Sequence, residues 1–258
     1  MTQPSAPVPQ DIVVTRNLTV SFGGREVLNN INISVPKGQT LALMGLSGVG
    51  KSTTLRCIIG LQRPTSGEIY VFGKDILHMR EGELNHLRRR LSMVFQMPAL
   101  FDSMTVGDNV AFPLREHGHL PEEEIQRIVA DRLRRVDLEG MEYLYPSQLS
   151  GGMQKRASIA RAICTDPELI LYDEPTTGLD PIISSVINEM VRNLQQALGA
   201  TSIVVTHDLN SAYTIADRIA FLFEGRIVEQ GTPDEFQNST NPYVVQFREG
   251  KTHGPIKV

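Results

Sequence analysis

One eight-residue stretch, GLSGVGKS at Gly45–Ser52, limits this chain to very few folds. It fits the pattern G-x-x-x-x-G-K-[ST] at every required position. The apolar run TLALMG before it predicts a buried strand, and KSTTLRCIIGL after it predicts a helix. Strand, glycine loop and helix N-terminus together form a phosphate cradle, because backbone N–H groups and the helix dipole both face the anion. A plain glycine-rich turn is the alternative, and the flanking strand and helix argue against it.

The chemistry of this loop predicts which groups bind ATP. The ammonium group of Lys51 would reach the β- and γ-phosphates, and the hydroxyl of Ser52 would bind Mg²⁺. The glycines allow the backbone to approach the phosphate oxygens closely. The predicted nucleotide-binding residues of the loop are Gly45, Leu46, Ser47, Gly48, Val49, Gly50, Lys51, Ser52 and Thr53.

A second apolar run, ELILYDEP, ends in two acids, Asp173 and Glu174. In phosphate-loop NTPases an acid at the end of a buried strand holds Mg²⁺, which is the role we expect for Asp173. Glu174 would then act as general base on the water that attacks the γ-phosphate. A pair of acids that caps a helix is the alternative, and the phosphate loop in the same chain weakens it.

A second glycine-rich cradle, PSQLSGGM, precedes the helical stretch QKRASIARAIC. Ser150 and the backbone N–H groups of Gly151 and Gly152 could cap a γ-phosphate. If this segment lies far from the chain's own phosphate loop, it can serve only a nucleotide on a second copy. Two cradles in one chain therefore predict a head-to-tail, two-fold dimer with two composite ATP sites. A glycine-rich helix cap without a ligand is the alternative.

The composition limits the partners and the compartment. The formal net charge is -4, which provides no basic excess for binding nucleic acid. The two cysteines, Cys57 and Cys164, fall in apolar stretches, which fits a reducing compartment without structural disulfides. No apolar run approaches the roughly 18 residues of a membrane span, and MTQPSAPVPQ lacks the features of a signal peptide. We therefore expect a cytosolic chain that could dock on a membrane protein.

Hydrophobic patterns predict one domain over residues 11–245, with a helical insertion at about 97–164. Alternating apolar residues predict antiparallel strands at 12–20 and 27–35, ahead of the buried strand at 40–44. An α/β pattern returns after residue 164, and RIAFLFEGRIVEQG predicts a hairpin that turns at Glu224 and Gly225. We expect residues 1–10 to form a disordered, proline-rich tail and residues 246–258 to form a loose C-terminal tail.

The ordered set GLSGVGKS, FQ, LSGG, LYDEP, GLD and TH resembles the nucleotide-binding subunits of ATP-binding cassette (ABC) transporters, over residues 12–240. The resemblance implies the ABC ATPase fold. In that fold an α/β phosphate-loop NTPase core with a mixed sheet carries an N-terminal antiparallel β-subdomain and an inserted α-helical signature subdomain. One departure is Met153, where the family usually has glutamine.

The same resemblance implies roles for four further residues. Gln96 would contact Mg²⁺ and the attacking water, and His207 would contact the γ-phosphate. Asp180 would cross the dimer interface, and Phe22 would stack on adenine. Taken singly, Gln96 and His207 are more often ordinary polar residues at strand ends, and Phe22 is more often part of a core.

The stretch FQMPALFDSMTVGDNVAFPLREH is similar to ATPase subunits of the MlaF type, which serve the Mla phospholipid transport systems. This resemblance implies phospholipid transport between the inner and outer bacterial membranes and maintenance of lipid asymmetry. It implies three partners besides a second copy: a permease of the MlaE type, an MCE-domain lipid-binding protein of the MlaD type, and a STAS-domain protein of the MlaB type. The chain would lie on the cytoplasmic face of the inner membrane, held there by the permease.

Other interpretations remain open from the sequence. Within transport, an importer of a small polar solute such as an amino acid is the alternative. A soluble ABC protein of DNA repair or translation would usually have coiled-coil insertions or two fused cassettes, and a phosphate-loop kinase would need no second copy. The apolar residues after Gln96 could receive a permease helix or could form the core of the helical subdomain; they are Leu100, Phe101, Met104 and Phe112.

Overall fold

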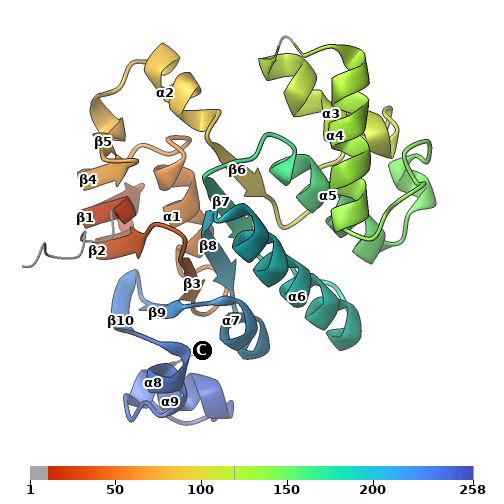
Figure 1. Ribbon diagram of the computed structural model, residues 1–258. Helices are drawn as coiled ribbons and strands as arrows, with labels where there is room; N and C mark the ends of the chain where they lie inside the picture. The colour runs from red at the N-terminus through yellow and green to blue at the C-terminus, as the bar shows by residue number, and fades with distance from the viewer. Residues whose placement is uncertain (1–10, 119, 258) are drawn as a thin grey trace, which may run out of the picture.

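The computed structural model describes residues 11–118 and 120–257, so the predicted tail at 1–10 lies outside the described residues. Two sheets and a separate group of helices make up the fold (Figure 1). A six-stranded sheet forms the centre, a four-stranded antiparallel sheet packs at one side, and the helices α3, α4 and α5 lie at the other. This is the mixed sheet, antiparallel β-subdomain and helical insertion that the sequence predicted.

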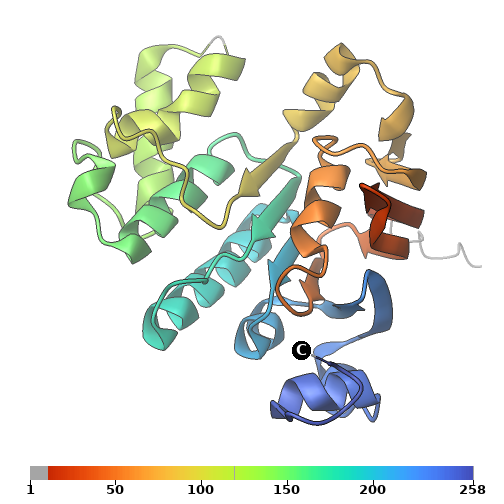
Figure 2. The same ribbon diagram turned by 180° about the vertical axis from the view of Figure 1, so that it is seen from behind.

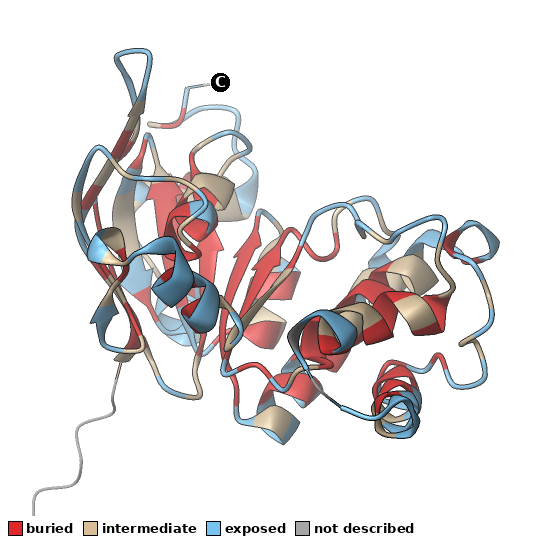
Figure 3. Cartoon of the chain, turned by 90° about the horizontal axis from the view of Figure 1, so that it is seen from above, coloured by how far each residue is buried: buried red, intermediate tan, exposed pale blue. Residues whose placement is uncertain are grey.

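The central sheet has the strand order β10-β9-β3-β8-β7-β6, and only β10 runs antiparallel to its neighbour. Every residue of β3, β7 and β8 is buried, which explains their almost continuous apolar sequences. Figure 3 shows these strands as a buried centre. The strands are β3 (Thr40–Met44), β6 (Leu91–Val94), β7 (Leu169–Asp173), β8 (Thr201–Thr206), β9 (Arg218–Phe223) and β10 (Arg226–Gly231).

The antiparallel sheet has the order β2-β1-β4-β5 and packs against helix α1 (Lys51–Ile58). Leu55 and Ile58 of α1 belong to one apolar cluster with Leu41 and Leu43 of β3, so α1 lies between the two sheets (Figure 2). This packing fixes the helix that follows the phosphate loop. The strands of this sheet are β1 (Asp11–Phe22), β2 (Arg25–Pro36), β4 (Ser66–Val71) and β5 (Lys74–Asp75).

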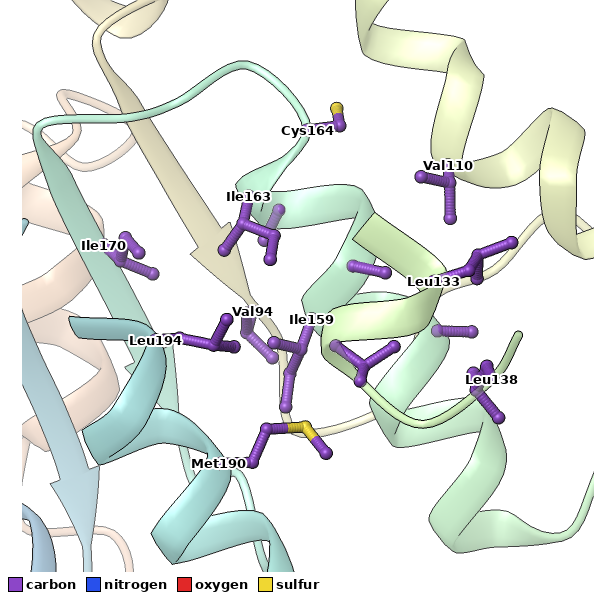
Figure 4. Packing of buried hydrophobic residues seen from close by; sticks show 14 of the residues in the cluster. Val94, Val110, Leu133, Leu138, Ile159, Ile163, Cys164, Ile170, Met190 and Leu194 are labelled. Carbon is purple, nitrogen blue, oxygen red and sulfur yellow. The ribbon is translucent and has the colours of Figure 1, made fainter. Parts of the chain in front are cut away.

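Helix α5 (Gly151–Ile163) joins the helical subdomain to the central sheet. Ile159 and Ile163 of α5 belong to the same apolar cluster as Val94 of β6 and Leu133 of α4 (Figure 4). The other helices of the subdomain are α3 (Val106–His117) and α4 (Glu122–Arg135), with the 3-10 turn η2 at Pro146–Gln148. Helix α4 begins with three glutamates and ends with arginines, which suits the helix dipole.

The remaining helices cover the core sheet and its ends. Helix α6 (Pro181–Leu198) packs on the face opposite α1, where Ile187 and Val191 meet Ile170 and Val204 of the sheet. The others are η1 (Ile76–His78), α2 (Glu81–Arg88), α7 (Leu209–Ile215), α8 (Pro233–Gln237) and α9 (Pro242–Glu249). Within residues 11–118 and 120–257, no helix is both long enough and apolar enough to cross a membrane.

The predicted loose tail at 246–258 is wrong for most of its length. Helix α9 runs across the predicted boundary to Glu249, and Ile256 is only 5% exposed, in a cluster with Phe236 and Val244. The amide of Gln246 donates to the carbonyl oxygen of Ile256 at 3.0 Å and accepts from its N–H at 2.7 Å. The segment is held through Ile256 and the Gln246 amide, and neither gives a periodic signal in so short a stretch.

The predicted hairpin turns at Glu224 and Gly225, both with positive φ, as a two-residue turn between these strands requires. Gly225 also contacts the antiparallel sheet, because its carbonyl oxygen accepts a hydrogen bond of 2.7 Å from the N–H of Asn29. A Cβ atom on Gly225 would lie 2.7 Å from the carbonyl oxygen of Val27. This turn therefore joins the two sheets at a point with no space for a side chain.

We expect Gly225→Ala to lower the free energy of unfolding more than Gly24→Ala, by about 1–3 kcal/mol, the usual cost of overpacking. Both glycines have positive φ, but a Cβ on Gly24 meets no atom within 4 Å. The difference therefore isolates the clash with Val27. Urea denaturation of the two variants measures it, and equal destabilisation would show that the contact between the sheets is easily displaced.

Candidate nucleotide site

A cavity of about 300 Å³ lies at the carboxyl ends of β3, β7 and β8. The parallel register sets Met44 beside Thr206 and Asp173 beside Val205, so the segments that follow these strands meet at one edge. The cavity is lined by Ser47, Gly48, Gly50, Lys51, Ser52, Thr53, Gln96, Glu174, Thr177 and His207. Residues predicted from four separate motifs therefore lie around one space.

The phosphate loop holds its lysine inside the curve of the backbone. The Nζ atom of Lys51 donates to the carbonyl oxygens of Gly45 at 2.8 Å and Leu46 at 3.0 Å. It also lies 3.4 Å from Oε1 of Glu174. Burial lowers the pKa of Lys51, and the nearby Glu174 opposes that shift. The ammonium group is thus held at the floor of the cavity, within the loop that would surround a phosphate.

Asp173 and Ser52 form a pair of oxygen ligands suited to Mg²⁺. The Oγ atom of Ser52 donates to Oδ1 of Asp173 at 2.7 Å, although the two residues are 121 positions apart. Burial raises the pKa of the Asp173 carboxyl, against the effect of that hydrogen bond. A cation beside this carboxylate would compensate its desolvation, and hard oxygen ligands are those that Mg²⁺ prefers. These residues therefore fit the predicted metal, together with Gln96 across the cavity.

Glu174 is held by three contacts in a strained backbone conformation. Its φ is 50°, an uncommon value for a residue other than glycine. Its Oε2 atom lies 2.7 Å from Nδ1 of His207 and accepts from the hydroxyl of Thr177 at 2.9 Å. The side chain is 11% exposed, whereas that of His207 is 49% exposed. The two predicted catalytic groups thus contact each other directly, and strain of this kind concentrates at functional sites.

Thr177 is a residue of this site that the sequence analysis missed. It lines the cavity and fixes the carboxylate of Glu174, which lies three positions before it. A local signal was available, because a threonine hydroxyl can donate to a carboxylate and Thr177 stands only three residues after Glu174. The run DEPTTGLD contains this spacing.

Five predicted residues at or near the loop are not part of the lining of this cavity: Phe22, Gly45, Leu46, Val49 and Asp173. The carbonyl oxygen of Gly45 accepts from Lys51, and Asp173 is hydrogen-bonded to Ser52. Leu46 and Val49 line a neighbouring cavity of about 460 Å³ with the hairpin turn at Phe223–Gly225 and with Lys257. Phe22 ends β1 and is 47% exposed, and it is absent from the described lining of either cavity. An exposed aromatic at this position rules out the alternative that Phe22 is core and leaves its ring free for a planar base.

The second cradle lies away from the phosphate cavity, on another surface of the same chain. Ser150 is the N-cap of α5, and its side chain accepts from the N–H of Met153 at 3.4 Å. A Cβ atom on Gly152 would lie 2.8 Å from the side chain of Ile183. Ile183 lies in the first turn of α6, whose N-cap is Asp180.

Ser150, Gly151, Gly152 and Asp180 therefore belong to one continuous surface. Among the described residues, none of these four lines the phosphate cavity. The two elements that the sequence analysis assigned to a second copy thus adjoin each other and not the chain's own site.

The family model described as "ABC transporter" matches residues 28–177. MlaF of Haemophilus influenzae, an "intermembrane phospholipid transport system ATP-binding protein", is 44% identical over 96% of this chain and 94% of its own length. MlaF of Escherichia coli K12 is 43% identical over 95% and 91%. A "probable ribonucleotide transport ATP-binding protein mkl" of Mycobacterium leprae is 40% identical over 96% of this chain and 72% of its own length.

Solved structures of ATP-binding cassettes share the fold. The cassette MJ0796, in a dimeric post-hydrolysis state bound to ADP and Pi, superposes with a TM-score of 0.79 at 34% identity, over 86% of this chain and 98% of that one. CbiO1 from Clostridium perfringens, part of the transporter complex cbiONQ, gives a TM-score of 0.82 at 34% identity, over 93% and 96%. With its complete phosphate site and these matches, the chain belongs to the ABC transporter family, as an ATP-binding subunit that resembles MlaF.

Proposed function

We propose that this chain hydrolyses ATP as a dimer and thereby powers a membrane permease that moves phospholipid between the inner and outer membranes. The observation that carries the ATPase is the cavity in which Lys51, Glu174 and His207 meet, with Asp173 hydrogen-bonded to Ser52 of its lining. The observation that carries the substrate is the similarity to MlaF over almost the whole of both chains. The cytoplasmic face of the inner membrane is the location that follows.

The side chains supply positioning and one proton acceptor. Lys51 would leave its contact with Glu174 and bind the β- and γ-phosphates, which frees the carboxylate to accept a proton from the attacking water. Thr177 and His207 hold that carboxylate in place, and His207 is exposed enough to contact the γ-phosphate as well. Bound at Ser52, Asp173 and Gln96, Mg²⁺ would neutralise charge on the phosphates.

A second copy would complete each site. Ser150, Gly151 and Gly152 lie at the start of α5, where backbone N–H groups and the helix dipole favour an anion. Since they share a surface with Asp180, a two-fold partner could contact both elements at once. The dimeric form of the cassette MJ0796 supports this arrangement.

A groove beside Gln96 is the surface we assign to the permease, of the MlaE type. A cavity of about 350 Å³ is lined there by Phe95, Phe101, Phe112 and Pro113, among others. Phe101 is 42% exposed and its ring centroid lies 4.9 Å from that of Phe112, whereas Leu100 packs on the core of the helical subdomain. Phe101 therefore fits the alternative of a permease surface, whereas Leu100 fits the alternative of a subdomain core. An MlaD-type and an MlaB-type protein would complete the assembly.

Glu174→Gln should lower the ATPase rate by at least about 10²-fold, because it removes the general base. ATP binding should persist, since the phosphate loop is intact, whereas Lys51→Ala should weaken ATP binding itself. Steady-state hydrolysis and a fluorescent nucleotide measure the two properties. Glu189→Gln, on the exposed part of α6, is the matched control. A Glu174→Gln variant that hydrolyses ATP at the wild-type rate would remove Glu174 from this role.

Ser150→Asp should abolish hydrolysis, because it keeps an N-cap residue but places a negative charge against the γ-phosphate of the partner's nucleotide. Ser150→Asn, a neutral cap of the same size, is the control and should retain most activity.

Mixing Ser150→Asp with Lys51→Ala protein tests the dimer directly. Half of randomly mixed dimers contain one of each chain, and each of those has one intact composite site, so roughly a quarter of the wild-type rate should return. If each chain used its own cradle, mixing two inactive proteins would restore nothing.

The substrate can be tested by purifying the chain with its membrane partners and analysing bound lipid by mass spectrometry. Phospholipid should remain bound to the purified complex, and adding phospholipid vesicles should raise the ATPase rate of that complex. The name of the mycobacterial relative favours a small polar solute as the second candidate. Stimulation by such a solute, with no lipid retained, would support that candidate instead.

A further inference from the structure

Two cations of helix α5 hold the segment that contains Gln96. Lys155 is 2% exposed, and its Nζ atom donates to the carbonyl oxygens of Phe95 at 3.1 Å and Gln96 at 2.6 Å. The guanidinium of Arg161 donates to the carbonyl oxygens of Ala99 at 2.7 Å and Pro98 at 3.2 Å. Four of the five backbone carbonyls between residues 95 and 99 are therefore fixed by one helix.

This arrangement costs stability that an apolar contact would not cost. Burial lowers the pKa of Lys155 to about 8, and burial also lowers the pKa of Arg161. Among the described residues, the hydrogen-bond partners of both cations are neutral backbone carbonyls, and the more distant Asp173 carboxylate also opposes the pKa shift of Lys155. A buried cation with only backbone partners fixes the geometry of a loop, and Ala99 in that loop has an uncommon φ of 51°.

The segment 95–99 adjoins three functional regions. Gln96 lines the phosphate cavity, while Phe95, Ala99 and Arg161 line the groove assigned to the permease. Ser150, the N-cap of helix α5, stands five residues before Lys155. The two cations thus join, within one rigid helix, the surface for the partner's nucleotide to the loop that faces the chain's own nucleotide.

We propose that Lys155 and Arg161 are positioning residues that couple the signature helix to the Gln96 segment. A shift of α5 then moves Gln96 relative to the phosphate cavity, and occupation of the groove moves α5. This inference rests on the proposed roles of Gln96 and Ser150 in hydrolysis. It adds that Gln96 and Ser150 do not act independently, because Lys155 and Arg161 fix the position of α5 relative to the Gln96 segment.

Lys155→Met, in the full-length dimer, keeps the length of the side chain and removes its charge. We expect kcat to fall at least about 10-fold, because small displacements of a positioning group have effects of this size. The KM for ATP should stay within about 2-fold of wild type, since the phosphate loop is not touched. Lys155→Arg restores a cation and should recover most of kcat.

Arg156→Met is the matched control. Arg156 is the next residue of the same helix, and its guanidinium also donates to backbone carbonyls, those of Val136 and Asp137, which directly follow α4. Its loss should lower the melting temperature without lowering kcat. If Lys155→Met behaves in the same way, with a lower melting temperature and an unchanged kcat, Lys155 is only structural and the proposal is wrong.

Two further variants, Arg161→Lys and Glu174→Gln, complete the test. Should Lys155→Met fail to fold, Arg161→Lys keeps the charge but loses the two-carbonyl geometry, and its kcat should still fall while KM does not; an unchanged kcat would overturn the proposal. Glu174→Gln is assayed in parallel. If kcat falls in Glu174→Gln but not in the variant of Lys155 or Arg161, the coupling role is wrong. If kcat falls in none of these variants, the proposed catalytic site itself is wrong.

Discussion

The parallel register of β3, β7 and β8 decides where every group of the nucleotide site lies. Each strand is buried along its whole length between α1 on one face and α6 on the other, so sliding one strand by a single residue would exchange its two faces and put every side chain against the wrong packing partners. The loops that leave the three strands are therefore fixed at one edge of the sheet. The phosphate loop, the two acids and His207 meet there as a result, although they come from distant parts of the chain.

Charge compensation inside the cavity follows from this convergence. Lys51 neutralises Glu174 at 3.4 Å, and Ser52 bonds Asp173 at 2.7 Å, so each buried acid has a partner from the phosphate loop. A nucleotide with its metal would take over both partners. The site is thus built so that binding exchanges internal contacts for contacts to the ligand, which limits the cost of holding two acids in a buried place.

The sequence predicted the parts of this protein whose signals are local. A glycine loop between a strand and a helix, two acids at a strand end and a two-residue hairpin turn each occupy a few consecutive residues. Short segments with mixed patterns were not predicted: no strand was assigned to residues 62–96, where β4, β5 and β6 lie. The tail was mispredicted for a related reason, because the contacts that hold it, from Ile256 and from the side-chain amide of Gln246, leave no pattern in the local sequence.

Contacts between distant residues explain the remaining gaps. The bond from Lys155 to Gln96 joins residues 59 positions apart, and nothing in the composition of either segment indicates it. The same holds for the packing of Gly152 against Ile183, which joins the second cradle to Asp180. Such pairings require the course of the backbone in space, so only the structure could provide them.

The order of the C-terminal segment has a practical consequence for handling this protein. Cutting the chain after Gly250 would uncover apolar surface on Phe236 and Val244 and would leave the Gln246 amide without either partner. Shortened versions would therefore tend to aggregate during purification, for reasons unrelated to nucleotide chemistry. An affinity tag fused beyond Val258 needs a spacer long enough for Ile256 to pack against Phe236 and Val244.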